Sequence, residues 1–108
     1  AFIEPESSIS IGINCVINSL AKINAGAIIN TGAIIEHEAE IGKFSHIAPN
    51  ATICGGVIIG ENAFVGANTV VKQGVTIGKN SIIGAGSTVL TNVPANSTYV
   101  GNPAIKLN

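Results

Sequence analysis

The reactive side chains of this sequence gather in one segment, INTGAIIEHEAEIGKFSH, which spans residues 29 to 46. The segment contains both histidines of the chain, and the first of them, His37, stands between Glu36 and Glu38. Imidazole titrates near neutral pH and a neighbouring carboxylate can fix its tautomer, so this arrangement suits a general base. The surrounding sequence must then show what kind of fold would hold His37 and His46, and where.

The composition of the chain excludes several classes of partner. Its 108 residues, 46% of them apolar, are enough for one domain, 1–108, and not for two. Six acidic residues stand against five lysines with no arginine, so neither nucleic acid nor a membrane surface is a predicted partner. The sequence shows no signal peptide and no apolar run of about 18 residues, the length of a membrane span. The low cysteine content fits a reducing, cytoplasmic setting.

A strict six-residue repeat dominates the chain. From Ile11 to Val89 every sixth residue is isoleucine or valine, fourteen times without a miss, and we call each six-residue unit that begins there a hexad. No helix has this period, and the fifth residue of each hexad is mostly small. The repeat therefore predicts short strands with two inward positions in each hexad, one for a large side chain and one for a small side chain.

The fourth residue of the hexad predicts a corner. It is asparagine or glycine in eleven of the fourteen hexads, and these residues accept a positive φ at low cost. A strand followed by a left-handed corner makes the chain coil, with three hexads in each turn and residues of successive turns stacked about 4.8 Å apart. We expect about six coils. The eleven residues are Asn14, Gly26, Gly32, Asn50, Gly56, Asn62, Asn68, Gly74, Asn80, Gly86 and Asn92.

The sixth residue of each hexad points outward and defines three columns. Two columns are largely apolar, and the third is mostly polar. Apolar columns on two adjacent faces imply buried contacts on both, so we predict a closed ring of copies, most simply a homotrimer, although a missing domain is an alternative cover. His46 belongs to an apolar column and is predicted at a subunit boundary. The columns are Val16, Ile34, Thr52, Val70, Thr88; Ile28, His46, Phe64, Ile82, Val100; and Lys22, Glu40, Ile58, Thr76, Pro94.

His37 occupies the third place of its hexad, at a corner, and Glu38 follows in the place normally held by asparagine or glycine. A glutamate there costs about 1 kcal/mol, which asks for a functional reason. In the coil above, Gly55 and Gly56 are predicted to leave backbone amides and space for a ligand. A base, a carboxylate that orients it and an amide donor are what acyl transfer needs. The alternative is an ordinary solvated corner histidine.

Metal and thiol chemistry have less support. A zinc site of the gamma carbonic anhydrase type needs three histidines, and the chain has two, so a third ligand would have to come from outside the pair. Cys15 and Cys54 match no zinc-binding spacing, and we expect neither a disulfide nor a metal cofactor. Cys54 is a conceivable nucleophile, but no base is expected in its own coil.

The motifs INTGAIIEHEAEIGKFSHIAPNATICGGVIIGENAFVGANTVV, VTIGKNSIIGAGSTVLTNVP and TYVGNPA resemble a known family. They are similar to the catalytic left-handed parallel β-helix of the sialic acid O-acetyltransferase and UDP-amino-sugar N-acetyltransferase family, a group of hexapeptide-repeat acyltransferases. The resemblance implies an all-β, trimeric fold, with His37 as base and Glu38 as the residue that orients it. It implies that His46 positions the acetyl donor or the substrate.

The same resemblance implies where acetyl-CoA binds. The coenzyme lies between neighbouring subunits in this family, near positions that match Gly55 and Gly56 and, higher up, Ala85 and Gly86. The VGNPA segment, with Gly101, matches the part that closes over the coenzyme, so residues 95–108 are expected to be a C-terminal closing segment; Asn102 replaces the usual aliphatic residue there. Candidate cations for the coenzyme phosphates are Lys72, Lys79 and Lys106.

Family members also carry an N-terminal sugar-nucleotide-binding domain, and we expect this chain, which begins Ala-Phe-Ile and has no methionine, to be a fragment without it. The predicted function is acetyl transfer from acetyl-CoA to a sugar, expected to be a nucleotide-linked amino sugar, by direct attack. The alternatives are an O-acetyltransferase of the serine or maltose type and a non-catalytic trimeric scaffold.

Overall fold

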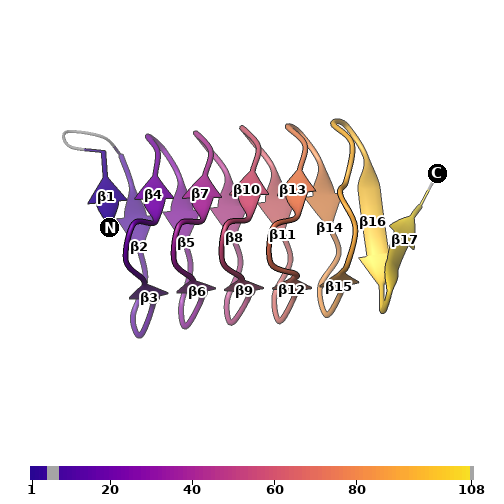
Figure 1. Ribbon diagram of the computed structural model, residues 1–108, viewed down its shortest axis with the longest axis horizontal. Helices are drawn as coiled ribbons and strands as arrows, with labels where there is room; N and C mark the ends of the chain where they lie inside the picture. Colours follow the sequence, from indigo (N-terminus) through magenta and orange to yellow (C-terminus); the bar gives the residue numbers. More distant parts are fainter. Residues whose placement is uncertain (5–7, 108) are drawn as a thin grey trace.

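The computed structural model describes residues 1–4 and 8–107, and these form a solenoid of short strands (Figure 1). Each regular strand has two residues, the sixth of one hexad and the first of the next, and the chain then turns. The strands are β1 Phe2–Ile3, β2 Ser10–Ile11, β3 Val16–Ile17, β4 Lys22–Ile23, β5 Ile28–Ile29, β6 Ile34–Ile35, β7 Glu40–Ile41, β8 His46–Ile47, β9 Thr52–Ile53, β10 Ile58–Ile59, β11 Phe64–Val65, β12 Val70–Val71, β13 Thr76–Ile77, β14 Ile82–Ile83, β15 Thr88–Val89, β16 Thr98–Gly101 and β17 Ala104–Lys106.

The strands stack into three sheets along the solenoid. Sheet 1 has the order β1-β4-β7-β10-β13, sheet 2 the order β2-β5-β8-β11-β14-β16-β17, and sheet 3 the order β3-β6-β9-β12-β15. All pairings are parallel except that of β16 with β17. Sheets 1 and 3 have five strands each, so the described residues make about five turns, and the expected six are not confirmed.

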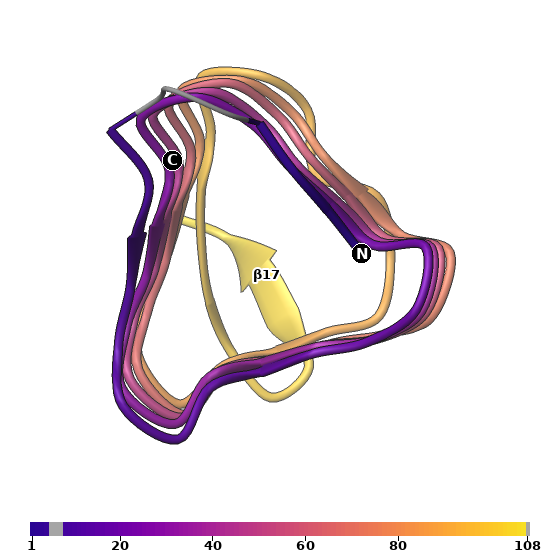
Figure 2. The same cartoon turned by 90° about the vertical axis from the view of Figure 1, so that its left-hand side faces the viewer.

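The cross-section is triangular, with one sheet on each side (Figure 2). Seen from the N-terminal end, the chain runs counter-clockwise as it recedes, which is the sense of the left-handed β-helix that the repeat resembles. The turns from sheet 3 to sheet 1 form what we call the 3–1 corner; the 1–2 and 2–3 corners are named in the same way.

Left-handed backbone occurs at the predicted corner positions. Ten of the eleven asparagines and glycines named above have a positive φ. The three hexads that break the rule also follow the backbone pattern, with φ of 61° at Leu20, 62° at Glu38 and 59° at Phe44. The corner geometry is thus imposed by the coil even where the side chain does not favour it.

Asn92 is the exception, because the last turn is shorter than the others. Val93 lies beside Ile77, and Thr98 beside Ile82, which are separations of 16 residues instead of 18. Asn92 has no left-handed φ; its Oδ1 atom accepts a hydrogen bond from the Thr76 amide at 2.9 Å. The last 3–1 corner therefore has no left-handed residue. Asn96, with φ 58°, is the left-handed residue of the following 1–2 corner, where its amide donates to the Lys79 oxygen at 2.9 Å.

The short turn also corrects two predicted outward columns. Val100 was expected above Ile82, but Thr98 takes that place. The Val100 side chain instead covers Gly84, where an added Cβ would lie 2.5 Å from Val100 Cγ1. Pro94 was expected above Thr76, but the Ile77–Val93 bridge shifts it out of that register.

The inward positions form the core as predicted. Isoleucine and valine at the first position alternate with small residues at the fifth, and nearly all are buried. Inward hydroxyl groups satisfy backbone carbonyls: Ser45 Oγ donates to the Gly60 oxygen and Ser81 Oγ to the Pro94 oxygen, both at 2.6 Å. Nothing in the described part of the chain forms a helix that could cross a membrane.

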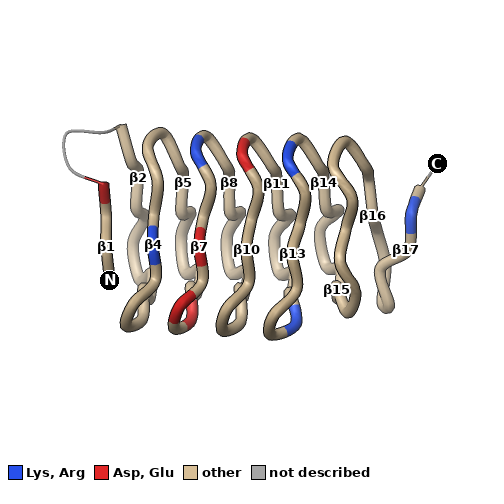
Figure 3. The backbone as a smooth tube through the Cα atoms, turned by 45° about the horizontal axis from the view of Figure 1, so that its top comes forward, with Lys and Arg blue, Asp and Glu red and all other residues tan. Residues whose placement is uncertain are grey.

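Charged side chains occupy only part of the surface (Figure 3). They gather on sheet 1, on the corners at its two edges and on β17. Strands β2, β5, β8, β11 and β14 of sheet 2, the turns of the 2–3 corner and the strands of sheet 3 contain no Lys, Arg, Asp or Glu. A continuous uncharged surface therefore runs from sheet 2 round the 2–3 corner onto sheet 3.

The corner rule makes a testable prediction about stability. Leu20 is 74% exposed and left-handed, so Leu20→Asn should remove backbone strain without losing packing and raise the free energy of unfolding by about 1 kcal/mol. Urea denaturation measures this. Asn68→Leu is the reciprocal variant, because Asn68 has φ 58° and should lose a similar amount. If neither substitution changes stability, the corners are not strained.

Candidate active site

His37 lies on the 3–1 corner, in the turn between β6 and β7. The turn is tied to its neighbours on both sides, since the Glu38 amide donates to the Ser19 oxygen at 3.1 Å and the Gly56 amide to the His37 oxygen at 3.0 Å. The backbone is thus fixed while the His37 side chain remains 53% exposed. A rigid corner presents the imidazole to whatever binds there.

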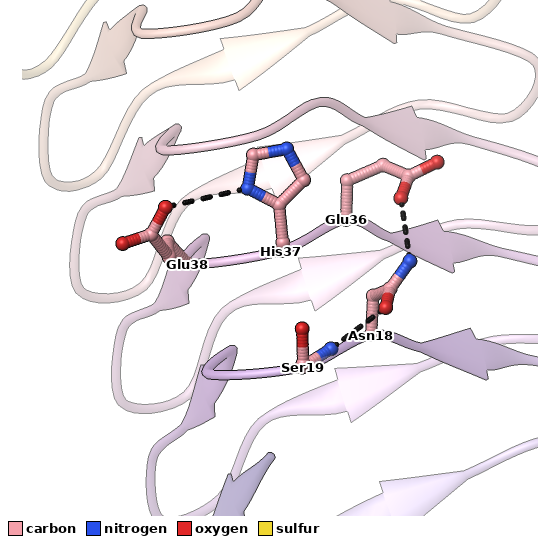
Figure 4. A network of polar contacts seen from close by, with 5 residues as sticks. All are labelled: Asn18, Ser19, Glu36, His37 and Glu38. Atoms are coloured by element: carbon pink, nitrogen blue, oxygen red, sulfur yellow. Dashed lines mark hydrogen bonds and ion pairs between the residues drawn. The ribbon is translucent and has the colours of Figure 1, made fainter.

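Glu38 faces one nitrogen of this imidazole. Its Oε1 atom lies 3.4 Å from His37 Nδ1, and Figure 4 shows Nε2 on the other side of the ring. When Nδ1 carries the proton that Glu38 accepts, Nε2 is left with a lone pair, as a general base requires. Both side chains are more than half exposed, so the pair orients the ring and adds little stability.

Gly55 makes room for the ring of His37. A Cβ added at Gly55 would lie 2.7 Å from His37 Cε1 and 2.8 Å from Nε2, whereas an added Cβ at Gly56 meets nothing within 4 Å. The corner is thus open at Gly56, while the imidazole itself fills the space at Gly55, and a ligand at Gly56 stays a prediction.

The amides of the two glycines differ as well. Gly56 N–H is used by the His37 carbonyl, but no acceptor for Gly55 N–H is found within residues 1–4 and 8–107. At the third hexad position the backbone N–H finds no backbone acceptor in the coil, so it is bonded only where a side chain accepts from it, as Asn18 Oδ1 does from the Ser19 amide. Gly55, the residue that packs against the His37 ring, thus has an N–H donor without an acceptor among the described residues.

A second carboxylate, Glu36, directly follows β6 and precedes His37 at the start of the 3–1 corner. Asn18 Nδ2 donates to Glu36 Oε1 at 2.9 Å, and Asn18 Oδ1 accepts from the Ser19 amide at 2.8 Å (Figure 4). The sequence analysis missed this bond, although the separation of 18 residues between Asn18 and Glu36 is the signal for it.

Cys54 is stacked one turn above Glu36. Burial of the thiol, and after it the negative charge of Glu36, raise the pKa of Cys54 above its usual value. A raised pKa leaves less thiolate at neutral pH, which argues against Cys54 as a nucleophile.

His46 lies in β8, on the outer face of sheet 2. Its Nε2 atom is 3.3 Å from Asn30 Nδ2, and its ring meets that of Phe64 edge to face at 5.2 Å. If Asn30 donates, Nε2 is the acceptor and Nδ1 carries the proton. Asn30 is a further residue that the sequence analysis did not single out.

The structure separates the predicted residues into groups. Sheet 2 is the side of the triangle opposite the 3–1 corner (Figure 2). His37, between β6 and β7, and His46, in β8, therefore lie on opposite sides of one chain. Ala85 and Gly86 lie in the turn between β14 and β15, on the 2–3 corner, and Gly101 ends β16. His37, Glu38, Gly55 and Gly56 come together on the 3–1 corner. Ala85, Gly86 and Gly101 form a second group, because Gly101 N–H donates to Ser87 Oγ at 3.1 Å, next to Gly86.

The fold brings no set of metal ligands together in the described part of the chain. Within residues 1–4 and 8–107, no three His, Cys, Asp or Glu side chains are grouped so that they could hold a metal ion. The two cysteines are both free and only partly buried.

Known families and structures resemble this chain. The family described as bacterial transferase hexapeptide (six repeats) matches residues 38–73 and 56–91. PerB from Caulobacter crescentus, solved with CoA and GDP-perosamine, is 35% identical with a TM-score of 0.88, covering 99% of this chain and 54% of that one. The chain thus spans about half the length of that protein.

Two other solved structures are similar. The acetyltransferase domain of PglB from Neisseria gonorrhoeae FA1090, in complex with acetyl coenzyme A, is 30% identical with a TM-score of 0.71, covering 98% of this chain and 54% of that one. A maltose O-acetyltransferase from Clostridium difficile 630 is 25% identical with a TM-score of 0.86, covering 100% of this chain and 68% of that one.

The contact between Gly55 and His37 can be tested by substitution. In Gly55→Ala the new methyl group should displace the imidazole and shift the His37 ring resonances in NMR spectra. Gly56→Ala is the matched control, because its methyl group has free space and should leave those resonances in place despite the backbone strain. Unchanged resonances in both proteins would show that the ring does not rest on Gly55.

Proposed function

This chain belongs to the bacterial hexapeptide transferase family, and from that premise we propose that it transfers acetyl groups from acetyl-CoA to a nucleotide-linked amino sugar. The observation that carries the proposal is the 3–1 corner itself. There His37 has Glu38 at Nδ1 and packs against Gly55, and among the described residues neither His37 Nε2 nor the Gly55 amide has a hydrogen-bond partner.

The proposed mechanism uses each of these groups once. His37 Nε2 takes a proton from the acceptor as it attacks the thioester carbon, and Glu38 stabilises the resulting imidazolium through Nδ1. Gly55 N–H donates to the oxyanion of the tetrahedral intermediate. The thiolate of coenzyme A then leaves and takes the proton from His37, so no covalent acetyl-enzyme is needed.

The similar proteins support the choice of substrates. PerB binds CoA and GDP-perosamine, an amino sugar linked to a nucleotide, and the PglB domain binds acetyl coenzyme A. The less similar maltose enzyme is an O-acetyltransferase, so the comparison favours an amine acceptor over a hydroxyl acceptor. We propose no metal cofactor, and we place the reaction in the cytoplasm, as the cysteine content suggests.

The remaining predicted residues become part of the coenzyme site in this proposal. Gly86 supports such a role, because an added Cβ there meets nothing within 4 Å, which leaves space for a ligand at this corner. Ala85 precedes it on the same turn, and Gly101 lies in the C-terminal hairpin of β16 and β17. Lys72, Lys79 and Lys106 are the candidate cations for the coenzyme phosphates.

The proposed assembly is a homotrimer in which the uncharged surface is buried. In a closed ring, sheet 3 of one copy faces sheet 2 of the next, and both lack charged side chains on their regular strands. The edge of sheet 3 that carries His37 then approaches the neighbouring face that carries His46. The opposite placement of these residues in one chain supports a site shared by two copies.

The base is tested by His37→Ala, which should lower turnover about 10²- to 10⁴-fold, the usual contribution of general base catalysis. Acetyl transfer to a panel of nucleotide-linked amino sugars, with GDP-perosamine among them, is the assay, and the oligomeric state is checked in parallel. Gln73→Ala is the control, because Gln73 occupies the same hexad position on the same corner. Full activity in His37→Ala would exclude His37 as the base.

A further inference from the structure

Glu36 is an anchored carboxylate beside the proposed base. It follows β6 directly and precedes His37, and its Oε1 atom is held at 2.9 Å by Asn18 Nδ2. The Asn18 amide is oriented in turn by the Ser19 N–H at 2.8 Å. A glutamate side chain at a surface normally keeps several rotamers, so two successive hydrogen bonds that fix it limit that freedom.

No cationic side chain among residues 1–4 and 8–107 forms an ion pair with this carboxylate. In the part of the chain that the structure describes, the one ion pair joins His37 and Glu38, and Glu36 is bonded to a neutral amide. Its charge is felt one turn higher, where it helps to raise the pKa of Cys54. A fixed, uncompensated negative charge offers a binding partner to a cationic group of a ligand.

The position of Glu36 relative to the imidazole is specific. Figure 4 shows Glu38 on the Nδ1 side of the His37 ring and the Glu36 carboxylate on the other side. On that other side, Nε2 makes no hydrogen bond to the described residues. An acceptor that gives its proton to Nε2 therefore enters beside Glu36. The two carboxylates would then have different partners, Glu38 the base and Glu36 the acceptor.

We propose that Glu36 binds the protonated amine of the acceptor and so selects amines over hydroxyl groups. This inference rests on the proposed acetyltransferase function. A primary ammonium must lose two protons to become an amide nitrogen, one released to solvent before attack and one passed through His37 to the leaving thiolate. A hydroxyl acceptor carries no charge and loses only one proton, so it gains nothing comparable from a carboxylate.

The test is Glu36→Gln, which keeps the size of the side chain and an oxygen that can accept from Asn18, but removes the charge. Its KM for the best amino sugar of the panel should rise about 10- to 100-fold, the range of a charge-assisted hydrogen bond, with the KM for acetyl-CoA unchanged. Inhibition by the counterpart that has a hydroxyl in place of the amine, such as GDP-rhamnose for GDP-perosamine, should stay the same.

Two further variants separate this role from a structural one. Glu40→Gln removes an equal charge on sheet 1, two residues beyond Glu38, and should leave both KM values unchanged. Asn18→Ala frees the Glu36 carboxylate without neutralising it and should raise the amine KM by less than Glu36→Gln does.

The outcomes distinguish this inference from the function on which it rests. If the wild-type protein acetylates amines and Glu36→Gln has the same amine KM, the role of Glu36 is overturned while the function stands. If Glu36→Gln weakens the binding of the amine and of its hydroxyl counterpart equally, Glu36 contributes to the shape of the site and not to recognition of the ammonium charge. The inference is then again wrong. If the wild type acetylates no amine in the panel, the proposed function itself fails.

Discussion

The structure depends on one backbone constraint, a left-handed residue at each regular corner of the coil in the described part of the chain. A φ near 60° at the fourth hexad position turns the chain, and asparagine and glycine meet that need at little cost. The regular corners place residues 18 apart on top of one another, so every side-chain column follows from them. Glu38 adopts the same backbone although its side chain does not favour it, and the proposed base lies directly before it.

The rigidity of the coil explains the form of the site. The regular corners are held by backbone hydrogen bonds to the turns below and above, so His37 needs no separate loop to position it. The same regularity sends His37 and His46 to opposite sides of the prism, because corners and faces keep their places from turn to turn. A reaction that uses both histidines then requires a second copy, and the uncharged surface on sheets 2 and 3 is suited to receive it.

The hexad pattern was enough to predict the strands, the buried residues at the first and fifth hexad positions, and almost all of the corners. The shortened turn was not predictable, because Asn92 satisfies the corner rule and only the pairing of Val93 with Ile77 shows that this corner is two residues shorter than the others. The site was predicted as far as sequence position determines it, in the stacking of Gly55 above His37. Side-chain contacts such as Asn18 with Glu36 and Asn30 with His46 depend on rotamers chosen across turns, which the repeat does not specify.

In the proposed assembly, each active site takes its base from one chain and His46 from another. Inactive His37→Ala and His46→Ala proteins, mixed under conditions in which subunits exchange, test this directly. In equal mixture about a quarter of the sites of a ring combine both intact histidines, so about a quarter of wild-type activity should return. Exchange verified by mass with no activity regained would contradict the shared site.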